Sequence, residues 1–278
     1  MIIIKTPEEI GIMTEGGKIL AKIMKELEKK VRPGITTKEL DRLAESLVSC
    51  PPTFVGRSRL RSAKAEAWAK EDKPKCSFKG YEGSCGEHTE SFPACLCTSI
   101  NEEIVHSVPS DRELKEKDII SLDLGIFYKG FHTDMAITLP IGKVSPEALR
   151  LIRVTKKALK RGIKKVRPGN KIGDIGNTIQ RYVESQGFNV IRDLCGHGIG
   201  RNLHEDPQIL NYGKRHKGEE LKEGQVLCLE PMVTAGDWKL KKTRDSFGYE
   251  TSDGSLSAHF EHTIAVTKDG CRILTDLK

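Results

Sequence analysis

Five side chains that could bind metal ions stand out because of where the sequence places them. The four acids among them lie in or beside apolar runs such as 119–124 and 226–232, and these two runs contain no Lys or Arg. An ionised carboxylate in such a setting is costly unless a positive charge compensates it. A bound cation is the simplest compensation, and four acids with one imidazole could hold two. The five residues are Asp123, Asp134, His197, Glu230 and Glu261.

Asp123 and Asp134 lie on either side of a turn signal at 127–130, which predicts a β-hairpin. A two-residue turn at 128–129 sets the acids directly opposite each other, and a turn shifted by one residue makes them diagonal neighbours. In either register the carboxylates face each other, which is unfavourable without a cation between them. The alternative is a solvated edge hairpin with two exposed acids, which the apolar flanks disfavour.

His197 lies in the run Gly196-His197-Gly198-Ile199-Gly200, whose glycines permit close approach of the backbone. A lone histidine is more often an ordinary core or surface residue, but the glycines and the acids reverse that expectation. A ligand set rich in oxygen with one nitrogen suits manganese, iron or cobalt at least as well as zinc. Two ions about 3.5–4 Å apart lower the pKa of a shared water, so the set favours hydrolysis over redox chemistry.

The chain contains an internal duplication that would position these residues. The run Lys-Val-Arg-Pro-Gly at 30–34 recurs at 165–169, and each copy joins two stretches of helical period. Thr6 and Glu9 predict a capping box at the start of the first helix. The sequence therefore predicts a helix–turn–helix in each half, with helical stretches through 19–27, 40–47, 149–163 and 175–183.

The duplication continues into predicted strands. Residues 114–123 parallel residues 221–230, so that Asp123 corresponds to Glu230. A His-x-x-Pro run stands upstream of each of these strands, at 106–109 and 204–207, and Asp134 and Glu261 each precede an apolar run with strand character. Chance matching of short motifs is the alternative, and four matches in the same order disfavour it. A pseudo-twofold axis would bring one histidine and two acids from each half to a central site.

Composition bounds the class of protein. The length of 278 residues and the 37% hydrophobic content allow one large α/β domain or two small ones. The net charge of +7 invites a nucleic-acid function, but both signs are mixed along the chain, which favours a solvated surface; a weak attraction to ribosomal RNA is the alternative. The N-terminus turns polar too soon for a signal peptide, and no stretch reaches the ~20 apolar residues of a membrane helix. Eight cysteines without an export signal indicate reduced thiols in the cytoplasm.

At the level of motifs, the chain resembles the type I methionine aminopeptidases of the pita-bread metallopeptidase family. The match covers most of 1–49 and 92–278. The resemblance implies an α/β (α+β) fold in which a duplicated, central antiparallel β-sheet is backed by helices about a pseudo-twofold axis. It also implies one catalytic domain over 1–278. Besides the Asp123 and Asp134 hairpin, the motifs that carry it are CTSINE at 97–102, GHGIG at 196–200, HEDP at 204–207, EPM at 230–232 and FEHT at 260–263.

The resemblance further implies two divalent metal ions, which could be cobalt, manganese, iron(II) or zinc. Asp123 would chelate one ion and His197 the other. Asp134 and Glu261 would bridge the two ions. Glu230 would contact the ion held by His197 and shuttle the proton of the attacking water.

The implied substrate is the N-terminal methionine of a nascent polypeptide whose second residue is small. His204 would hydrogen-bond the reacting amide, and His106 would hold the substrate backbone. Cys97, Phe92 and Phe247 match positions of the methionine pocket, although Phe247 stands where relatives usually carry tryptophan. The protein would act as a monomer.

Residues 50–91 form a segment longer than its counterpart in the family. Its basic first part suggests a transient contact with the ribosome, and a tolerated surface insertion is the favoured alternative. Residues 63–70 have helix-forming composition. An accessory zinc site could use Cys50, Cys76, Cys85 and His88, but their spacing matches no recognised zinc motif. The cysteines expected to be buried thiols are Cys95, Cys195, Cys228 and Cys271.

Two other functions compete with methionine removal. A proline-directed peptidase of the same fold, such as a prolidase, usually adds an N-terminal domain, for which this chain has no room. A non-catalytic protein that uses the scaffold to bind RNA or the ribosome would be expected to lose metal ligands, yet all five are present.

Overall fold

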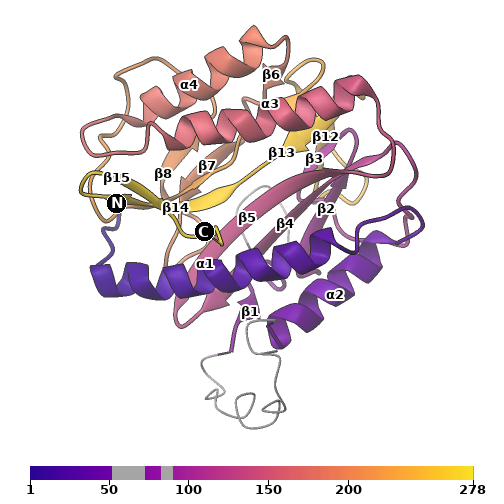
Figure 1. The fold of residues 1–278 in the computed structure, drawn as a ribbon, viewed down its shortest axis with the longest axis horizontal. Coiled ribbons are helices and arrows are strands. Elements are labelled where there is room, and N and C mark those ends of the chain that lie inside the picture. Colours follow the sequence, from indigo (N-terminus) through magenta and orange to yellow (C-terminus); the bar gives the residue numbers. More distant parts are fainter. Residues whose placement is uncertain (52–72, 83–89, 278) are drawn as a thin grey trace.

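The repeated helix pairs flank a set of strands to which both halves of the chain contribute (Figure 1). The structure is a computed structural model that describes residues 1–51, 73–82 and 90–277. All four predicted helical stretches lie within observed helices, and the capping box between Thr6 and Glu9 is present. Within the described ranges, every helix is too short or too polar to cross a lipid bilayer. The helices are α1 (Pro7–Glu28), α2 (Thr37–Ser49), α3 (Pro146–Ile163) and α4 (Ile172–Ser185).

Each half builds an antiparallel sheet. In the first half, β5 lies along one edge of β4, while β1 and β2 follow one another along the other edge. The second-half sheet has the order β15-β14-β9-β7-β8. The first-half strands are β1 (Lys75–Cys76), β2 (Leu96–Ile100), β4 (Ile119–Tyr128) and β5 (Phe131–Pro140). The second-half strands are β7 (Cys195–Gly198), β8 (Glu205–Leu210), β9 (Val226–Leu229), β14 (His262–Thr267) and β15 (Gly270–Ile273).

Two smaller three-stranded sheets complete the structure. One has the order β13-β10-β6 and the other the order β11-β12-β3. Their strands are β3 (Glu103–Val105), β6 (Asn189–Val190), β10 (Met232–Thr234), β11 (Leu240–Lys242), β12 (Tyr249–Thr251) and β13 (Ser257–His259).

The backbone repeats itself at the turn that follows the first helix of each half. Gly34 N–H donates to the carbonyl of Leu114 at 2.8 Å, and Gly169 N–H donates to the carbonyl of Leu221 at 3.2 Å. Both glycines have a φ of 83°, in the left-handed region where glycine carries no steric penalty. The duplicated Pro-Gly pair therefore performs the same task twice: it turns the chain from one helix to the next and ties the turn to the start of the strand segment.

The hairpin of β4 and β5 adopts the second of the two predicted registers, in which the turn is shifted by one residue. Tyr128 pairs with Phe131, so the turn is at Lys129 and Gly130, with φ values of 47° and 87°. Two left-handed turn residues match the twist of the strands, and a glycine at the second position makes this turn easy to adopt. Of the two alternatives, the turn at 128–129 with the acids directly opposite is therefore excluded, and the diagonal arrangement is confirmed.

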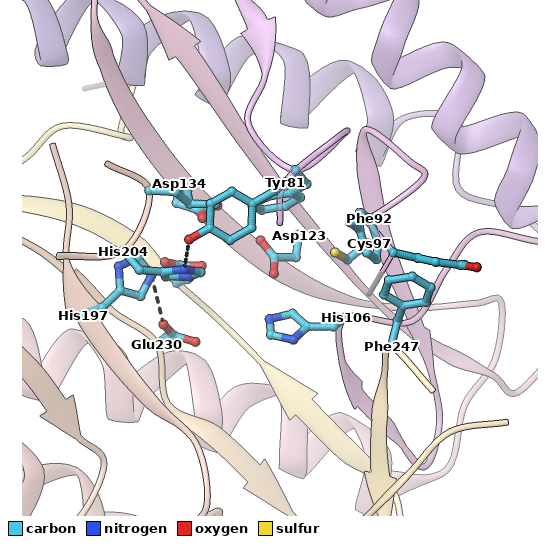
Figure 2. A pocket seen from close by; sticks show the side chains of 14 residues that line it. Tyr81, Phe92, Cys97, His106, Asp123, Asp134, His197, His204, Glu230 and Phe247 are labelled. Carbon is cyan, nitrogen blue, oxygen red and sulfur yellow. Dashed lines mark hydrogen bonds and ion pairs between the residues drawn. The ribbon is translucent and has the colours of Figure 1, made fainter. Parts of the chain in front are cut away.

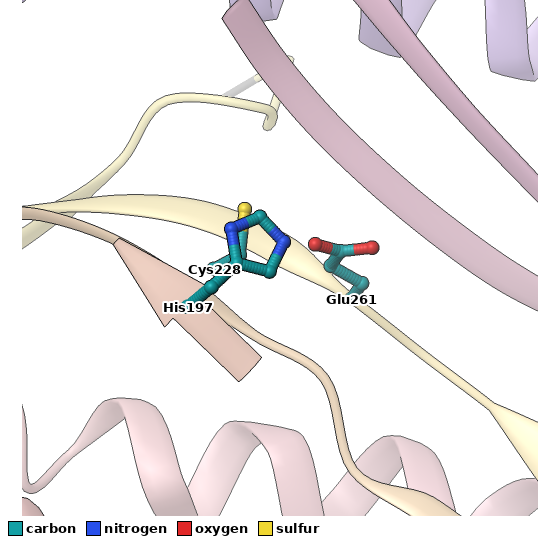
Figure 3. Close-up of side chains that lie close together, drawn as sticks. All are labelled: His197, Cys228 and Glu261. Carbon is teal, nitrogen blue, oxygen red and sulfur yellow. The ribbon is translucent and has the colours of Figure 1, made fainter. Parts of the chain in front are cut away.

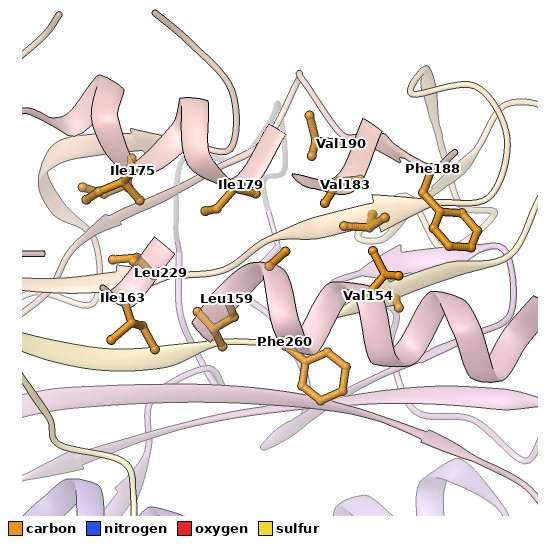
Figure 4. Packing of buried hydrophobic residues seen from close by; sticks show 14 of the residues in the cluster. Val154, Leu159, Ile163, Ile175, Ile179, Val183, Phe188, Val190, Leu229 and Phe260 are labelled. Carbon is orange, nitrogen blue, oxygen red and sulfur yellow. The ribbon is translucent and has the colours of Figure 1, made fainter. Parts of the chain in front are cut away.

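A separate hydrophobic cluster lies under each helix pair. Under α1 and α2 the buried side chains include Leu20, Ile23 and Leu40. Figure 4 shows the second cluster, in which Leu159 of α3 and Val183 of α4 pack over the second-half sheet. The helices thus stabilise the sheet from outside and leave its opposite face free to carry polar side chains.

One expectation about the cysteines is wrong, because Cys76 and Cys95 form a disulfide. Cys76 pairs with Ile126 on one edge of β4, and Leu96 pairs with Leu124 further along the same edge. The chain therefore leaves and rejoins this edge at neighbouring points, which brings the two sulfurs together. Among the other described cysteines, Cys228 is buried as expected, whereas Cys195 and Cys271 are partly exposed.

The disulfide removes Cys76 as a thiolate ligand for the accessory zinc site considered above. Cys85 and His88 lie outside the described residues, as do the predicted helix at 63–70 and the basic residues from Arg57 to Lys70.

The packing of α1 against the C-terminal segment predicts opposite effects for two glycines of one helix. A Cβ on Gly17 would lie 2.3 Å from the carbonyl oxygen of Leu274, whereas Gly11 has nothing within 4 Å. We expect Gly17→Ala to lower the free energy of unfolding by about 1–3 kcal/mol through overpacking. Gly11→Ala should raise it by about 0.5–1 kcal/mol through helix propensity. Urea denaturation measures both, and equal effects would contradict the packing described.

Candidate metal centre

The two sheets meet where β5 of the first half lies beside the start of β14 in the second. Glu261 N–H donates to the carbonyl of Ala136 at 2.9 Å. Asp134 N–H donates to the hydroxyl of Thr263 at 2.8 Å. These bonds place the backbone of two predicted ligands, one from each half, in adjacent positions, as the duplication predicts.

Three carboxylates converge on one face of this junction. Asp123 pairs with Ala136 and Asp134 with Gly125, so the two acids are diagonal neighbours whose side chains leave the hairpin on the same side. The exposed fractions of Asp123, Asp134 and Glu261 are 6%, 3% and 2%. One oxygen atom from each of the three lies within 4.8 Å of the others.

The buried acids have oxygens that the described protein residues do not satisfy. Asp123 Oδ1, Asp134 Oδ1 and Glu261 Oε1 are buried without a hydrogen-bond partner, and none of the three acids forms an ion pair with a described Lys or Arg. Buried polar atoms are normally paired, and carboxylate oxygens are ligands for divalent cations. The residues present therefore fit divalent metal ions.

His197 and Glu230 approach the same cluster from the second half. The Nδ1–H of His197 donates to the carbonyl of Gly198 at 2.8 Å, which leaves the lone pair of Nε2 free. That lone pair faces Glu230 Oε1 at 3.6 Å. Two electron-pair donors facing each other need a cation or a proton between them, so this pair also fits a metal ligand set. Figure 3 shows His197 and Glu261 beside Cys228, whose sulfur lies in the same group.

The glycines around His197 are required by close backbone contacts. A Cβ on Gly196 would lie 2.3 Å from the carbonyl oxygen of Cys228, and one on Gly198 would lie 2.1 Å from the carbonyl oxygen of Asp206. Both contacts are with backbone atoms, which cannot easily move. The Gly-His-Gly sequence therefore allows β7 to lie closely between β8 and β9 while His197 projects into the site.

Burial controls the charge of every group in the cluster. It raises the pKa of Asp134 to about 7, and it raises the pKa of Asp123, Glu230 and Glu261 well above the usual range, with help from repulsion among the acids. It lowers the pKa of His197 to about 3, so the imidazole is neutral near pH 7. The protein scaffold thus disfavours the charged carboxylates, and a bound cation would favour them.

The carboxylates form the polar end of a cavity whose other end is apolar (Figure 2). All three predicted pocket residues line it: Cys97 is buried, and the rings of Phe92 and Phe247 meet edge to face with centroids 5.6 Å apart. Phe78 and Leu203 extend the apolar wall.

Both predicted substrate-site histidines also line the cavity. His106 has a φ of 60°, an uncommon conformation for a residue with a Cβ, and burial lowers its pKa to about 4. The ring of His204 lies 4.4 Å from the ring of His197, and its Nδ1 lies 2.8 Å from the hydroxyl oxygen of Tyr81. Strained backbone is common at functional sites, which is consistent with a working role for His106.

Several residues of the site are absent from the sequence-based prediction. Tyr81 and Glu90 belong to the segment 50–91, which the sequence analysis treats as an insertion, yet both line the cavity. His259, to which the sequence analysis gives no role, is buried with Nε2 at 3.5 Å from Glu230 Oε2. Its pairing with Met232 brings it there. A local signal exists only for Tyr81, as an aromatic residue shortly before Phe92.

The fold and the buried carboxylates together define a metallopeptidase of the pita-bread type. The chain belongs to metallopeptidase family M24, whose family model matches residues 11–268, and membership implies divalent metal ions. It is 44% identical to methionine aminopeptidase 1 of Bacillus subtilis over 99% of both chains, and 43% identical to the methionine aminopeptidase of Clostridium perfringens over 100% of both.

Solved structures agree. The methionine aminopeptidase of Thermotoga maritima matches with a TM-score of 0.86 and 40% identity, over 99% of this chain and 100% of that one. The prolidase of Pyrococcus furiosus matches with a TM-score of 0.69 and 21% identity, over 99% of this chain and 66% of that one, which shows a common fold alone.

The raised pKa of Asp134 predicts how the stability of the metal-depleted protein depends on pH. The folded state holds this proton up to about pH 7, whereas the unfolded chain releases it near pH 4. Stability contributed by protonated Asp134 is therefore present below pH 4 and lost as the pH rises through 7. Buried histidines act in the opposite direction, so the wild type is compared with Asp134→Asn.

After chelation, we expect the free energy of unfolding of the wild type to fall, relative to that of Asp134→Asn, between about pH 5 and about pH 7.5. The first pH lies below the pKa of Asp134 in the folded state and the second lies above it. Urea midpoints at both pH values measure the difference. The raised pKa would be contradicted if the difference between the two urea midpoints were the same at both pH values, or if the wild type became relatively more stable at the higher pH.

Proposed function

We infer that the protein removes the initiator methionine from polypeptides by metal-dependent hydrolysis of the first peptide bond. The observation that carries this is one cavity with buried carboxylates at one end and an apolar pocket of Phe92, Cys97 and Phe247 at the other. Methionine aminopeptidases at 43–44% identity over essentially the whole chain support it. A small second residue is the expected preference.

We propose that two divalent ions occupy the site. Asp123 would hold one ion, His197 and Glu230 the other, and the central pair Asp134 and Glu261 would bridge them. When bound, such ions act as Lewis acids that polarise a carbonyl and make a water molecule more acidic. Cobalt, manganese, iron(II) and zinc all remain candidates, since each accepts mixed carboxylate and imidazole ligands.

The side chains around the cavity supply the remaining chemistry. Glu230, which lies between His197 and His259, is proposed to move the proton of the attacking water to the leaving amine. His204 would donate to the reacting amide, and His106 would hold the substrate backbone. The apolar pocket would hold the methionine side chain, and this fixes the first peptide bond beside the carboxylates.

Tyr81 would control how His204 acts. Burial lowers the pKa of His204, so its ring is neutral near pH 7. When the Tyr81 hydroxyl donates to Nδ1, the ring proton lies on Nε2, and the histidine presents an N–H donor to the substrate.

The two alternative functions are less well supported. Prolidases share the fold at about 20% identity, and the chain covers only about two thirds of their length. A non-catalytic RNA-binding protein does not need five potential metal ligands around a cavity. Cleavage of Met-Ala-Ser but not of an Xaa-Pro dipeptide would exclude the prolidase function. Any metal-dependent turnover would exclude the non-catalytic function.

The remaining proposals concern the cellular setting. We propose that the protein acts on nascent chains as a cytoplasmic monomer. The ribosome contact proposed for the basic part of 50–91 concerns residues that, apart from Lys73 and Lys75, lie outside the described ranges.

Removal of a bridging carboxylate provides the direct test. We expect Asp134→Asn to lower turnover of Met-Ala-Ser at least about a thousandfold, because the amide neither carries the charge nor bridges two cations. Metal analysis should show fewer than two ions per chain. The exposed Asp193→Asn serves as the control and should retain both metal and activity. Unchanged turnover of Asp134→Asn would refute the bridging role.

The bond from Tyr81 to His204 is tested by Tyr81→Phe. Loss of one hydrogen bond should lower kcat about tenfold with KM nearly unchanged, since the ring remains in place and only the tautomer is released. Steady-state kinetics on Met-Ala-Ser measure both constants, with Tyr212→Phe as the control. A rise in KM at constant kcat would instead assign Tyr81 to substrate binding alone.

A further inference from the structure

The positive charge of the protein is concentrated on α3 and the turn that follows it. Residues 146–167 contain nine Lys and Arg and one acid, Glu147, so this segment carries a net charge of +8. The whole chain carries +7, which means that the remaining residues are together close to neutral. The excess charge of the molecule is therefore a local property of one helix.

The fold does not require this charge, because the duplication provides an internal comparison. The segment 11–32 occupies the same place in the first half, and it contains six Lys and Arg with three acids. One of these cations is also paired: Lys29 lies 2.6 Å from Glu26. Two helices with the same structural role thus differ in net charge by five units, which points to a function of α3 beyond packing.

The cations line a groove between α3, α4 and the loop at 214–217. Two adjoining hollows share Arg161 and Lys165, and none of the described residues that line them is acidic. None of the groove cations forms an ion pair with a described carboxylate. We call this surface the basic groove; its cations are Lys157, Lys160, Arg161, Lys164, Lys165, Arg181 and Arg215.

The basic groove also has ordered contacts and neutral hydrogen-bonding groups. The guanidinium of Arg161 stacks over the ring of Tyr182 at 4.2 Å, which holds it at the surface of the groove. Asn177 and Gln186 line the same hollow, and each side-chain amide has a second N–H besides the one that it donates within the chain. Fixed cations beside amides are among the groups that bind phosphate and sugar in nucleic-acid complexes.

We propose that the basic groove binds the phosphate backbone of a nucleic acid, and that this nucleic acid is RNA. RNA is favoured because the inferred substrate is a nascent chain, and this preference alone rests on the proposed function. An anionic membrane fits less well, since Leu149 is the sole large apolar side chain exposed on α3 or α4 within the described residues. The groove shares no lining residue with the peptide cavity.

The test compares two variants of the full chain with equal loss of charge. The groove variant carries Arg161→Gln, Lys165→Gln, Arg181→Gln and Arg215→Gln. The control variant carries Lys18→Gln, Lys22→Gln and Lys25→Gln on the exposed side of α1, and Lys30→Gln in the exposed turn that follows it. Neither set touches the metal centre, so both variants should hydrolyse Met-Ala-Ser at the wild-type rate, which verifies their folding.

Binding is measured by fluorescence anisotropy with a labelled RNA duplex of about 16 base pairs over a range of salt concentrations. We expect the groove variant to bind at least about thirtyfold more weakly near 0.1 M salt, and the slope of log K against log salt to fall by about three to four. The control variant should stay within about twofold of the wild type.

If RNA affinity fell equally in both variants, or stayed unchanged in both, the basic groove would not be the RNA-binding site. A DNA duplex of the same length and vesicles of phosphatidylglycerol with phosphatidylcholine form the other arms. Equal groove-dependent affinity for DNA would keep the phosphate site and overturn the preference for RNA. Groove-dependent binding to vesicles without binding to RNA would overturn the proposal. Peptidase activity is measured separately. Absence of RNA binding would therefore leave the proposed reaction intact, and absence of peptidase activity would leave the phosphate-binding site intact.

Discussion

The mutual repulsion of buried carboxylates is the constraint around which this protein is built. Asp123, Asp134 and Glu261 are almost fully buried, and part of their hydrogen-bonding capacity finds no partner among the described residues. Each buried charge costs several kcal/mol unless it is compensated. A scaffold that holds them together must therefore gain its stability elsewhere, and it must prevent the acids from turning outwards to solvent.

The duplicated fold meets both requirements. Each helix pair covers its own sheet with a large apolar cluster, so the favourable burial lies on the outer side of the strands. Asp123 and Asp134 lie on β4 and β5, and Glu261 lies directly before β14. Neighbouring hydrogen bonds fix their backbone: the bonds of Glu261 with Ala136 and of Asp134 with the Thr263 hydroxyl join the two halves directly at the ligands. Rigid strands hold such a set more exactly in register than loops could.

Much of this could be predicted from the sequence because the signals are local. The apolar runs around Asp123 and Glu230, the glycines beside His197 and the repeated Pro-Gly turn each act within a few residues. The features that sequence reasoning missed depend on pairing between distant segments. His259 reaches Glu230 only because β13 pairs with β10, and Cys76 meets Cys95 only because β1 and β2 share an edge of β4. Tyr81 was set aside as part of an insertion, although the disulfide closes the loop that carries it into the site.

The two charged regions of the molecule do not compensate each other. The carboxylates lie in the cavity, whereas the cations of the basic groove are mostly exposed on α3, α4 and the adjoining turns. Both helices lie outside the strands (Figure 1). Exposed charges are screened over about 8–10 Å at physiological ionic strength. The pKa values of Asp123 and Glu261 are raised, whereas nearby cations would stabilise the charged carboxylates and lower them. Buried acids and exposed cations therefore each require a partner from outside the chain: small divalent ions within the sheet, and an extended polyanion on the helices. The net charge of +7 reveals neither, because it adds together two regions that act independently.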